Sequence, residues 1–163
     1  MLMKNDDLAI YLNDHLAGSI AAIEAIDHLV EIYRGKPIAS FCKELRDQIT
    51  ADQYELREIM RALDVKESSV RKAGAWIAEK FARLKLQPEG EGSGDPGLFL
   101  TLEALVLGIT GKQILWRALA TLPESWSQLR RFDFARLQAR AIEQAERVDA
   151  KRLEAAREAL RPM

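Results

Sequence analysis

The chain has little of several features that mark common protein classes. Its single cysteine, Cys42, excludes an internal disulfide and a thiolate metal site. Its 24 basic and 25 acidic residues nearly cancel, so it lacks the basic surface typical of proteins that bind nucleic acid or anionic membranes. The longest apolar stretch, residues 102–109, is too short to cross a bilayer and contains Glu103. We therefore expect no nucleic-acid partner and no membrane partner.

Targeting features are also scarce. The first residues, MLMKNDDLAIYLNDH, turn polar too soon for a secretory signal, so a reducing cytoplasm is the expected location. A length of 163 residues, of which 48% are hydrophobic, fits one domain spanning 1–163 with a sizeable core.

The sequence has no strand-like alternation of useful length and no internal repeat. Apolar residues instead recur at three- and four-residue steps, which predicts an all-α fold. The connection GKP between the first two helices is short, so these two should be antiparallel neighbours. The expected helices cover residues 6–34, 38–63, 67–86, 97–121 and about 125–160.

Glycine and proline are concentrated in one segment. The run QPEGEGSGDPG holds four of the nine glycines and two of the five prolines, which predicts a flexible linker at about 87–97. Within it, Asp95 and Pro96 offer an N-cap and a first-turn proline for the next helix. That helix is apolar nearly all round, which predicts that it is buried. Gly108 and Gly111 lower its helix propensity, so we expect a neighbouring helix to pack closely there.

Polar side chains stand on stripes that should be apolar. His15 lies on the buried face of the first helix, Asp52 on that of the second, and Arg152 on that of the last. Glu103 stands nearly alone in the third long helix. A buried charge is costly unless it is paired or bound to a metal. These groups are therefore expected either to satisfy one another across a bundle or to face a ligand.

The expected pairings follow from the connections between helices. The GKP turn should bring Ser19 level with Asp52 and His15 level with Glu55, and Gln144 should lie level with Glu103 across the second turn. Three interpretations stay open for this polar ridge: a structural network, a metal or ligand site, or a solvated surface. The candidate cluster consists of His15, Asp52, Glu55 and Glu103.

Arg152 is the expected counter-charge for that cluster. A guanidinium is always charged and matches carboxylates bidentately, so Arg152 should reach Glu103, Asp52 or Glu55, or extend to the end of the bundle. Inside the bundle it would place a fixed positive charge where a di-metal protein needs none.

The layout resembles the ferritin-like superfamily, which includes ferritins, bacterioferritins and rubrerythrins. The resemblance implies a four-helix bundle of two antiparallel hairpins joined by a long crossover, here with an extra short helix. The family's di-iron site takes a Glu from two helices and Glu-x-x-His from the other two. This chain has no Glu on the inner face of its first helix, and it has Asp52-Gln53-Tyr54-Glu55 in the second and Gln144 with Glu146 in the last. Glu103 matches a family ligand position by type.

The incomplete ligand set directs the functional expectation. We expect a ferritin-like bundle without an intact di-iron site that acts as a structural module or binds a partner or ligand. Catalysis is not expected, and no cofactor is expected. The alternative is a degenerate metal-binding protein or oxidoreductase, for which iron, manganese or zinc are the candidates because soft ligands are absent.

A second copy of the chain is the expected macromolecular partner. Trp76, Trp116 and Trp126 are large side chains of the kind that anchor interfaces, although core packing is the more common role of such residues. The sequence therefore suggests a homodimer. A small-molecule ligand is compatible with the polar cluster, but the sequence does not identify one.

Overall fold

The computed structural model describes residues 5–68, Glu79 and 94–162. These residues form an all-α bundle of four α-helices and contain no β-strand. The elements are α1 (Asn5–Ile32), α2 (Pro37–Ala62), α4 (Pro96–Leu119), a short 3₁₀ helix η1 (Ser127–Arg131) and α5 (Phe134–Ala159).

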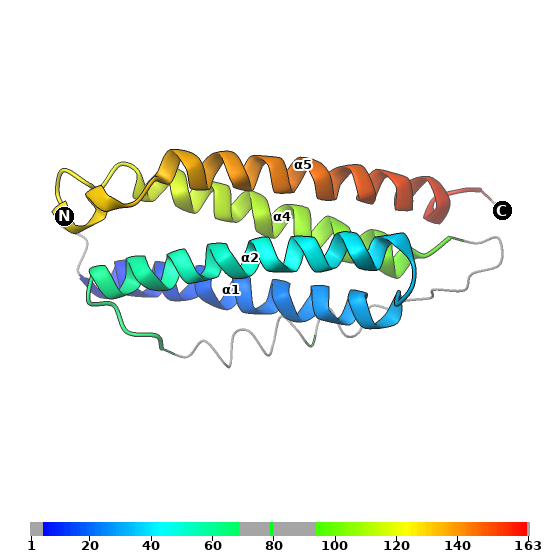
Figure 1. The fold of residues 1–163 in the computed structure, drawn as a ribbon, viewed down its shortest axis with the longest axis horizontal. Coiled ribbons are helices and arrows are strands. Elements are labelled where there is room, and N and C mark those ends of the chain that lie inside the picture. Colours follow the sequence, from blue (N-terminus) through cyan, green and yellow to red (C-terminus); the bar gives the residue numbers. More distant parts are fainter. Residues whose placement is uncertain (1–4, 69–78, 80–93, 163) are drawn as a thin grey trace.

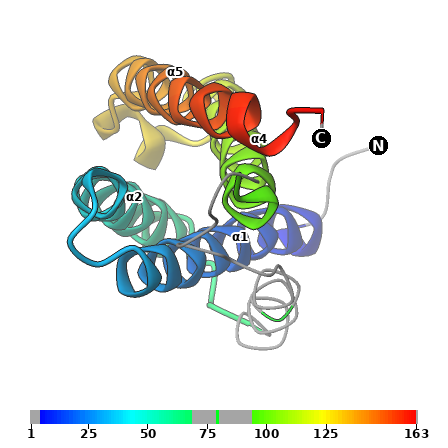
Figure 2. The ribbon, with the colours of Figure 1, turned by 90° about the vertical axis from the view of Figure 1, so that its right-hand side faces the viewer.

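The helices pack in two pairs around a shared core. α1 lies along α2, α4 lies along α5, and α4 also packs against α1 (Figures 1 and 2). Each helix contributes fully buried leucines, among them Leu16, Leu45, Leu105 and Leu137. Burial of these side chains is the main favourable contribution to folding.

The sequence predicted these helices well. The predicted helices at 6–34, 38–63 and 97–121 each lie within two residues of α1, α2 and α4. Asp95 caps α4 as expected, because its carboxylate accepts a hydrogen bond from the Leu98 amide at 2.9 Å. The predicted helix at 67–86 and most of the predicted linker at 87–97 lie outside the described residues, apart from a few positions at their ends.

The last helix begins nine residues later than predicted. The sequence suggested a start near residue 125, whereas α5 begins at Phe134. Residues 127–131 form a 3₁₀ helix instead of an α-helix. The extended backbone of Phe132 (φ −93°, ψ 134°) then separates this 3₁₀ helix from α5. The Asp133 carboxylate then accepts a hydrogen bond from the Arg136 amide at 2.9 Å, which makes Asp133 the N-cap.

α4 is less buried than its composition suggested. Leu100, Leu107 and Ile114, at seven-residue steps, are 43%, 70% and 55% exposed, because α5 and α1 cover only part of the helix. By length and composition alone, α4 is the one helix among the described residues that is long and apolar enough to cross a membrane. An interior helix of a bundle has the same composition. Within this fold, Glu103 and Lys112 of α4 form ion pairs with α5 and α2.

Two glycines adopt positive φ for different reasons. Gly35 (φ +83°) turns the chain between α1 and α2, and a Cβ there would meet nothing within 4 Å. Gly94 (φ +67°) lies at the entry to α4, where a Cβ would stand 2.3 Å from the Glu158 carbonyl. The Tyr33 hydroxyl donates to the neighbouring Asp95, which joins the end of α1 to the start of α4. Because of its positive φ and the nearby Glu158 backbone, position 94 accepts only glycine.

We expect Gly94→Ala to destabilise the protein more than Gly35→Ala. Both substitutions incur the left-handed backbone cost of about 1–2 kcal/mol, but only Gly94→Ala also forces a side chain into the backbone of α5. The free energy of unfolding, measured by urea titration of both variants, checks this. Equal losses would mean that the α5 end moves aside without cost.

Candidate functional site

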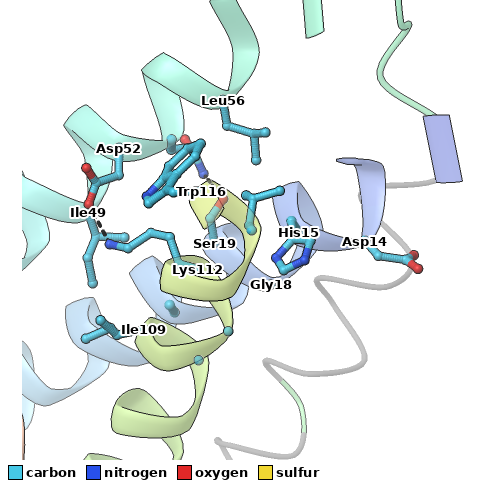
Figure 3. Close-up of a pocket in the computed structure, with 15 residues that line it drawn as sticks. Asp14, His15, Gly18, Ser19, Ile49, Asp52, Leu56, Ile109, Lys112 and Trp116 are labelled. Atoms are coloured by element: carbon cyan, nitrogen blue, oxygen red, sulfur yellow. Dashed lines mark hydrogen bonds and ion pairs between the residues drawn. The ribbon is translucent and has the colours of Figure 1, made fainter. Parts of the chain in front are cut away.

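A cavity of about 290 Å³ lies between α1, α2 and α4 (Figure 3). Its walls are largely apolar and include Ile49, Leu56 and Ile109. Asp52 of α2 and Lys112 of α4 lie at one side, and His15 of α1 lies at another. The arrangement resembles general ligand pockets, which are mostly apolar with a few placed polar groups.

Three glycines make room for this cavity. Gly18 of α1 and Gly108 and Gly111 of α4 all line it, and a Cβ at any of them would meet no atom of the described residues within 4 Å. Gly18 and Gly108 are exposed, and Gly111 is half-buried. The sequence-based expectation that a helix packs closely against Gly108 and Gly111 is therefore wrong. A glycine inside a helix costs about 1 kcal/mol relative to alanine. Among the described residues, no close helix contact compensates for this loss of helix stability. The glycines instead leave open space.

A buried ionic network forms the polar side of the cavity. The Asp52 side chain is 1% exposed and accepts hydrogen bonds from Lys112 Nζ at 2.5 Å and from Gln144 Nε2 at 3.0 Å. Arg140 Nη2 donates to its other oxygen. Lys112 Nζ also donates to Gln144 Oε1 at 2.5 Å. Three helices thus meet at one carboxylate, which is stable only because all of its contacts are hydrogen-bonded.

The network has an excess of positive charge and of hydrogen-bond donors. One carboxylate, Asp52, faces two cations, Lys112 and Arg140. Burial lowers the pKa of Lys112, Asp52 opposes that shift, and Arg140 adds to it. Two buried N–H donors, Trp116 Nε1 and Arg140 Nε, have no hydrogen-bond partner among the described residues.

A second polar chain joins α1 to α2 beside the first. Arg57 Nη1 donates to Gln53 Oε1 at 2.6 Å, and Gln53 Nε2 donates to Ser19 Oγ at 3.0 Å. The Ser19 hydroxyl donates to the Leu16 carbonyl at 2.7 Å. Ser19 therefore lies level with Gln53, one residue from the predicted level of Asp52. Because its proton is already donated, this hydroxyl is not set up as a nucleophile.

His15 lies at the side of the cavity away from the ionic network. Its ring contacts Tyr11 edge-on with centroids 4.8 Å apart. Burial lowers the pKa of His15 below its usual range, and Asp14 only partly opposes this. The imidazole is therefore neutral at neutral pH. The Asp14 carboxylate points away from the cavity (Figure 3).

The four predicted cluster residues do not meet at one point. His15 and Asp52 line the same cavity, but Glu55 pairs with Arg136 at 3.1 Å and Glu103 pairs with Arg152 at 3.1 Å. Within residues 5–68 and 94–162, no three His, Cys, Asp or Glu side chains are grouped so that they could hold a metal ion. The expected contact between Arg152 and Glu103 is present, and Asp149 also accepts from Arg152.

Gln144 lies level with Lys112 rather than with Glu103, so this predicted pairing was wrong. The error has a single origin. α5 begins at 134 instead of 125, a difference of nine residues, and position 112 is also nine residues beyond 103. Because α5 starts nine residues later, each α5 residue lies beside an α4 residue nine positions further along than predicted.

Sequence reasoning also missed Lys112, Arg140 and the cavity role of Trp116. Trp116 is 1% exposed, as its core interpretation implied, and Trp126 is partly buried, while Trp76 lies outside the described residues. The available signal was Lys112 itself, a cation in the middle of a mostly apolar helix.

No protein-family model, curated protein or solved structure matches this chain. The chemistry of the site therefore rests on its own geometry. That geometry offers an apolar space, hydrogen-bond donors and positive charge, and it offers no metal-ligand group and no activated nucleophile among the described residues.

We expect Asp52→Asn to cost about 3 kcal/mol of unfolding free energy, because it leaves two largely buried cations without a carboxylate. Asp47→Asn on the exposed face of the same helix is the matched control, and it should stay within about 0.5 kcal/mol of the parent. Urea denaturation of both variants at pH 7 measures the difference. A neutral Asp52→Asn would contradict the importance of the pairing.

The lowered pKa of His15 predicts a pH dependence of stability. The unfolded chain binds a proton near the ordinary histidine pKa while the folded chain resists it, so stability is fully present above that value and falls on acidification below it. His15→Gln should flatten the stability profile between about pH 5 and 7. His28→Gln, on the exposed face of the same helix, is the control. Unfolding free energies at several pH values test this, and equal slopes in His15→Gln and the parent would refute it.

Proposed function

We propose that this protein is a ferritin-like helical bundle that binds a small, largely apolar organic molecule in the cavity between α1, α2 and α4. The observation that carries the proposal is the placement of three glycines around one space that no side chain of the described residues fills. We further propose that it acts as a binding module without a di-iron site and without catalysis.

The ferritin-like part of the proposal is supported by the register of the side-chain contacts between α4 and α5. Glu103–Arg152 and Lys112–Gln144 have residue numbers that add to 255 and 256, as expected for antiparallel neighbours α4 and α5. The tight turn at Gly35 supports the same arrangement for α1 and α2. A long connection then separates the two hairpins, between residues 63 and 95, as in ferritin-like crossovers.

The size and walls of the cavity support a small organic ligand. An apolar cavity of about 150 Å³ is enough to bind benzene, so a cavity of about 290 Å³ suits a molecule of roughly two fused rings. Ile49, Leu56 and Ile109 offer an apolar lining for it. The free energy of such binding comes mainly from apolar area removed from water.

The competing metal-centre interpretation receives less support from the same residues. Each carboxylate that a di-metal site would need is already paired with a cation: Asp52 with Lys112 and Arg140, Glu55 with Arg136, and Glu103 with Arg152. The donor set is therefore that of an ion-pair network.

We expect Gly111→Leu to reduce binding of the neutral probe 2-naphthamide at least about tenfold, since the added side chain would occupy the cavity. Stability should hold or rise by about 1 kcal/mol, because glycine is the poorer helix former. Ala139→Leu on the exposed face of α5 is the control for a surface leucine. Isothermal titration calorimetry measures affinity, and urea titration measures stability.

The outcome decides between the cavity and the surface. Unchanged affinity in Gly111→Leu together with binding by the parent would place the probe elsewhere, such as on the exposed leucines of α4, and would overturn the proposal. Loss of affinity together with loss of folding would be resolved by Gly111→Ala, which adds a single methyl group to open space.

A further inference from the structure

The proposed cavity has a polarity that restricts its ligand, and the following inference rests on the proposed function. We infer that the ligand is an apolar monocarboxylate, with its hydrocarbon body against Leu56 and Ile109 and its carboxylate directed at Trp116 Nε1 and Lys112.

The first argument is charge. Asp52 and Lys112 line the cavity with one negative and one positive charge, and Arg140, which is not part of the lining, adds a second positive charge through its ion pair with Asp52. The other carboxylate near the cavity, Asp14, is exposed and points away from it (Figure 3). His15 adds no charge at neutral pH because burial holds its pKa low. A ligand with one negative charge balances the remaining positive charge in a region of low dielectric.

The second argument is the unpartnered donor at the same place. The Trp116 side chain is 1% exposed and lines the cavity, and its Nε1–H has no acceptor among the described residues. In Figure 3 the indole nitrogen is turned toward the side where Asp52 and Lys112 lie. Buried polar groups without a partner are rare, so each calls for an explanation. A carboxylate oxygen is the acceptor that this indole lacks.

The third argument concerns the ligands that the site disfavours. A cationic ligand would face Lys112 in the cavity lining, and Arg140, on the other oxygen of Asp52, adds to the repulsion. A covalent imine on Lys112 would require its Nζ as a free amine, but that nitrogen is held by Asp52 and Gln144. A neutral hydrocarbon would fill the space and leave the extra positive charge and the indole N–H without a partner. A carboxylate supplies both an acceptor for the indole N–H and a negative charge beside Lys112.

The test compares three probes of one shape on the full-length protein by isothermal titration calorimetry. These are 2-naphthoate, 2-naphthamide and 2-naphthylmethylammonium, at pH 7.5 and low salt. We expect 2-naphthoate to bind at least about tenfold more tightly than the amide, because hydrogen bonds to a charged acceptor are the stronger ones. We expect the ammonium to bind most weakly.

Variants assign the preference to the proposed residues. Trp116→Phe keeps an aromatic ring and removes the N–H, and should weaken binding of 2-naphthoate about tenfold. Trp126→Phe, outside the cavity lining, is the matched control. Lys112→Met should bring the ratio of naphthoate to amide affinity close to one. The comparison of probes on the unmodified chain needs no variant and stands if either substitution prevents folding.

Each outcome bears on a different statement. Equal affinity for 2-naphthoate and 2-naphthamide would overturn the carboxylate inference and leave the proposed apolar binding function in place. Tightest binding of the ammonium would overturn it in favour of a cationic ligand. No binding of any of the three probes would overturn the inference and the proposed function together.

Discussion

The structure depends on one buried carboxylate. Asp52 is 1% exposed in the middle of the bundle, and a charge there persists only because α4 and α5 bring Lys112, Arg140 and Gln144 to it. The carboxylate therefore fixes the height at which three helices meet. It also concentrates more positive than negative charge at one side of a cavity, so the same constraint that joins the helices gives the cavity its electrostatic character.

The ion pairs on α5 extend this constraint along the bundle. Glu44, Asp52 and Glu55 of α2 pair with Arg147, Arg140 and Arg136 of α5, and the residue numbers add to 191 or 192 in every pair. The two helices are thus aligned by long side chains that bridge between them. The exposed pairs contribute little to stability individually, but together they hold one register. Each of these three carboxylates has its own arginine.

The sequence predicted the helices and part of the site, and the reasons are specific. Hydrophobic periodicity located α1, α2 and α4 to within two residues. The short GKP turn predicted that Ser19 lies level with Asp52, and in the structure Ser19 pairs with the next residue, Gln53. The register of α5 was not predictable, because the sequence of residues 125–133 is also compatible with an α-helix, whereas the structure has a 3₁₀ helix and an N-cap there. Lys112 was missed because a flexible side chain reaches inward from a position that a helical wheel does not mark.

The glycines show why a cavity is harder to read than a helix. In sequence, Gly108 and Gly111 are equally compatible with close helix packing and with open space, since both need a small residue. The structure separates the two, because an added Cβ would meet no atom of the described residues within 4 Å. Alanine at these positions would give a more stable helix without any clash. A bundle whose helices had only to pack together would gain nothing from the glycines, whereas a bundle that admits a ligand between α1 and α4 needs the room they leave.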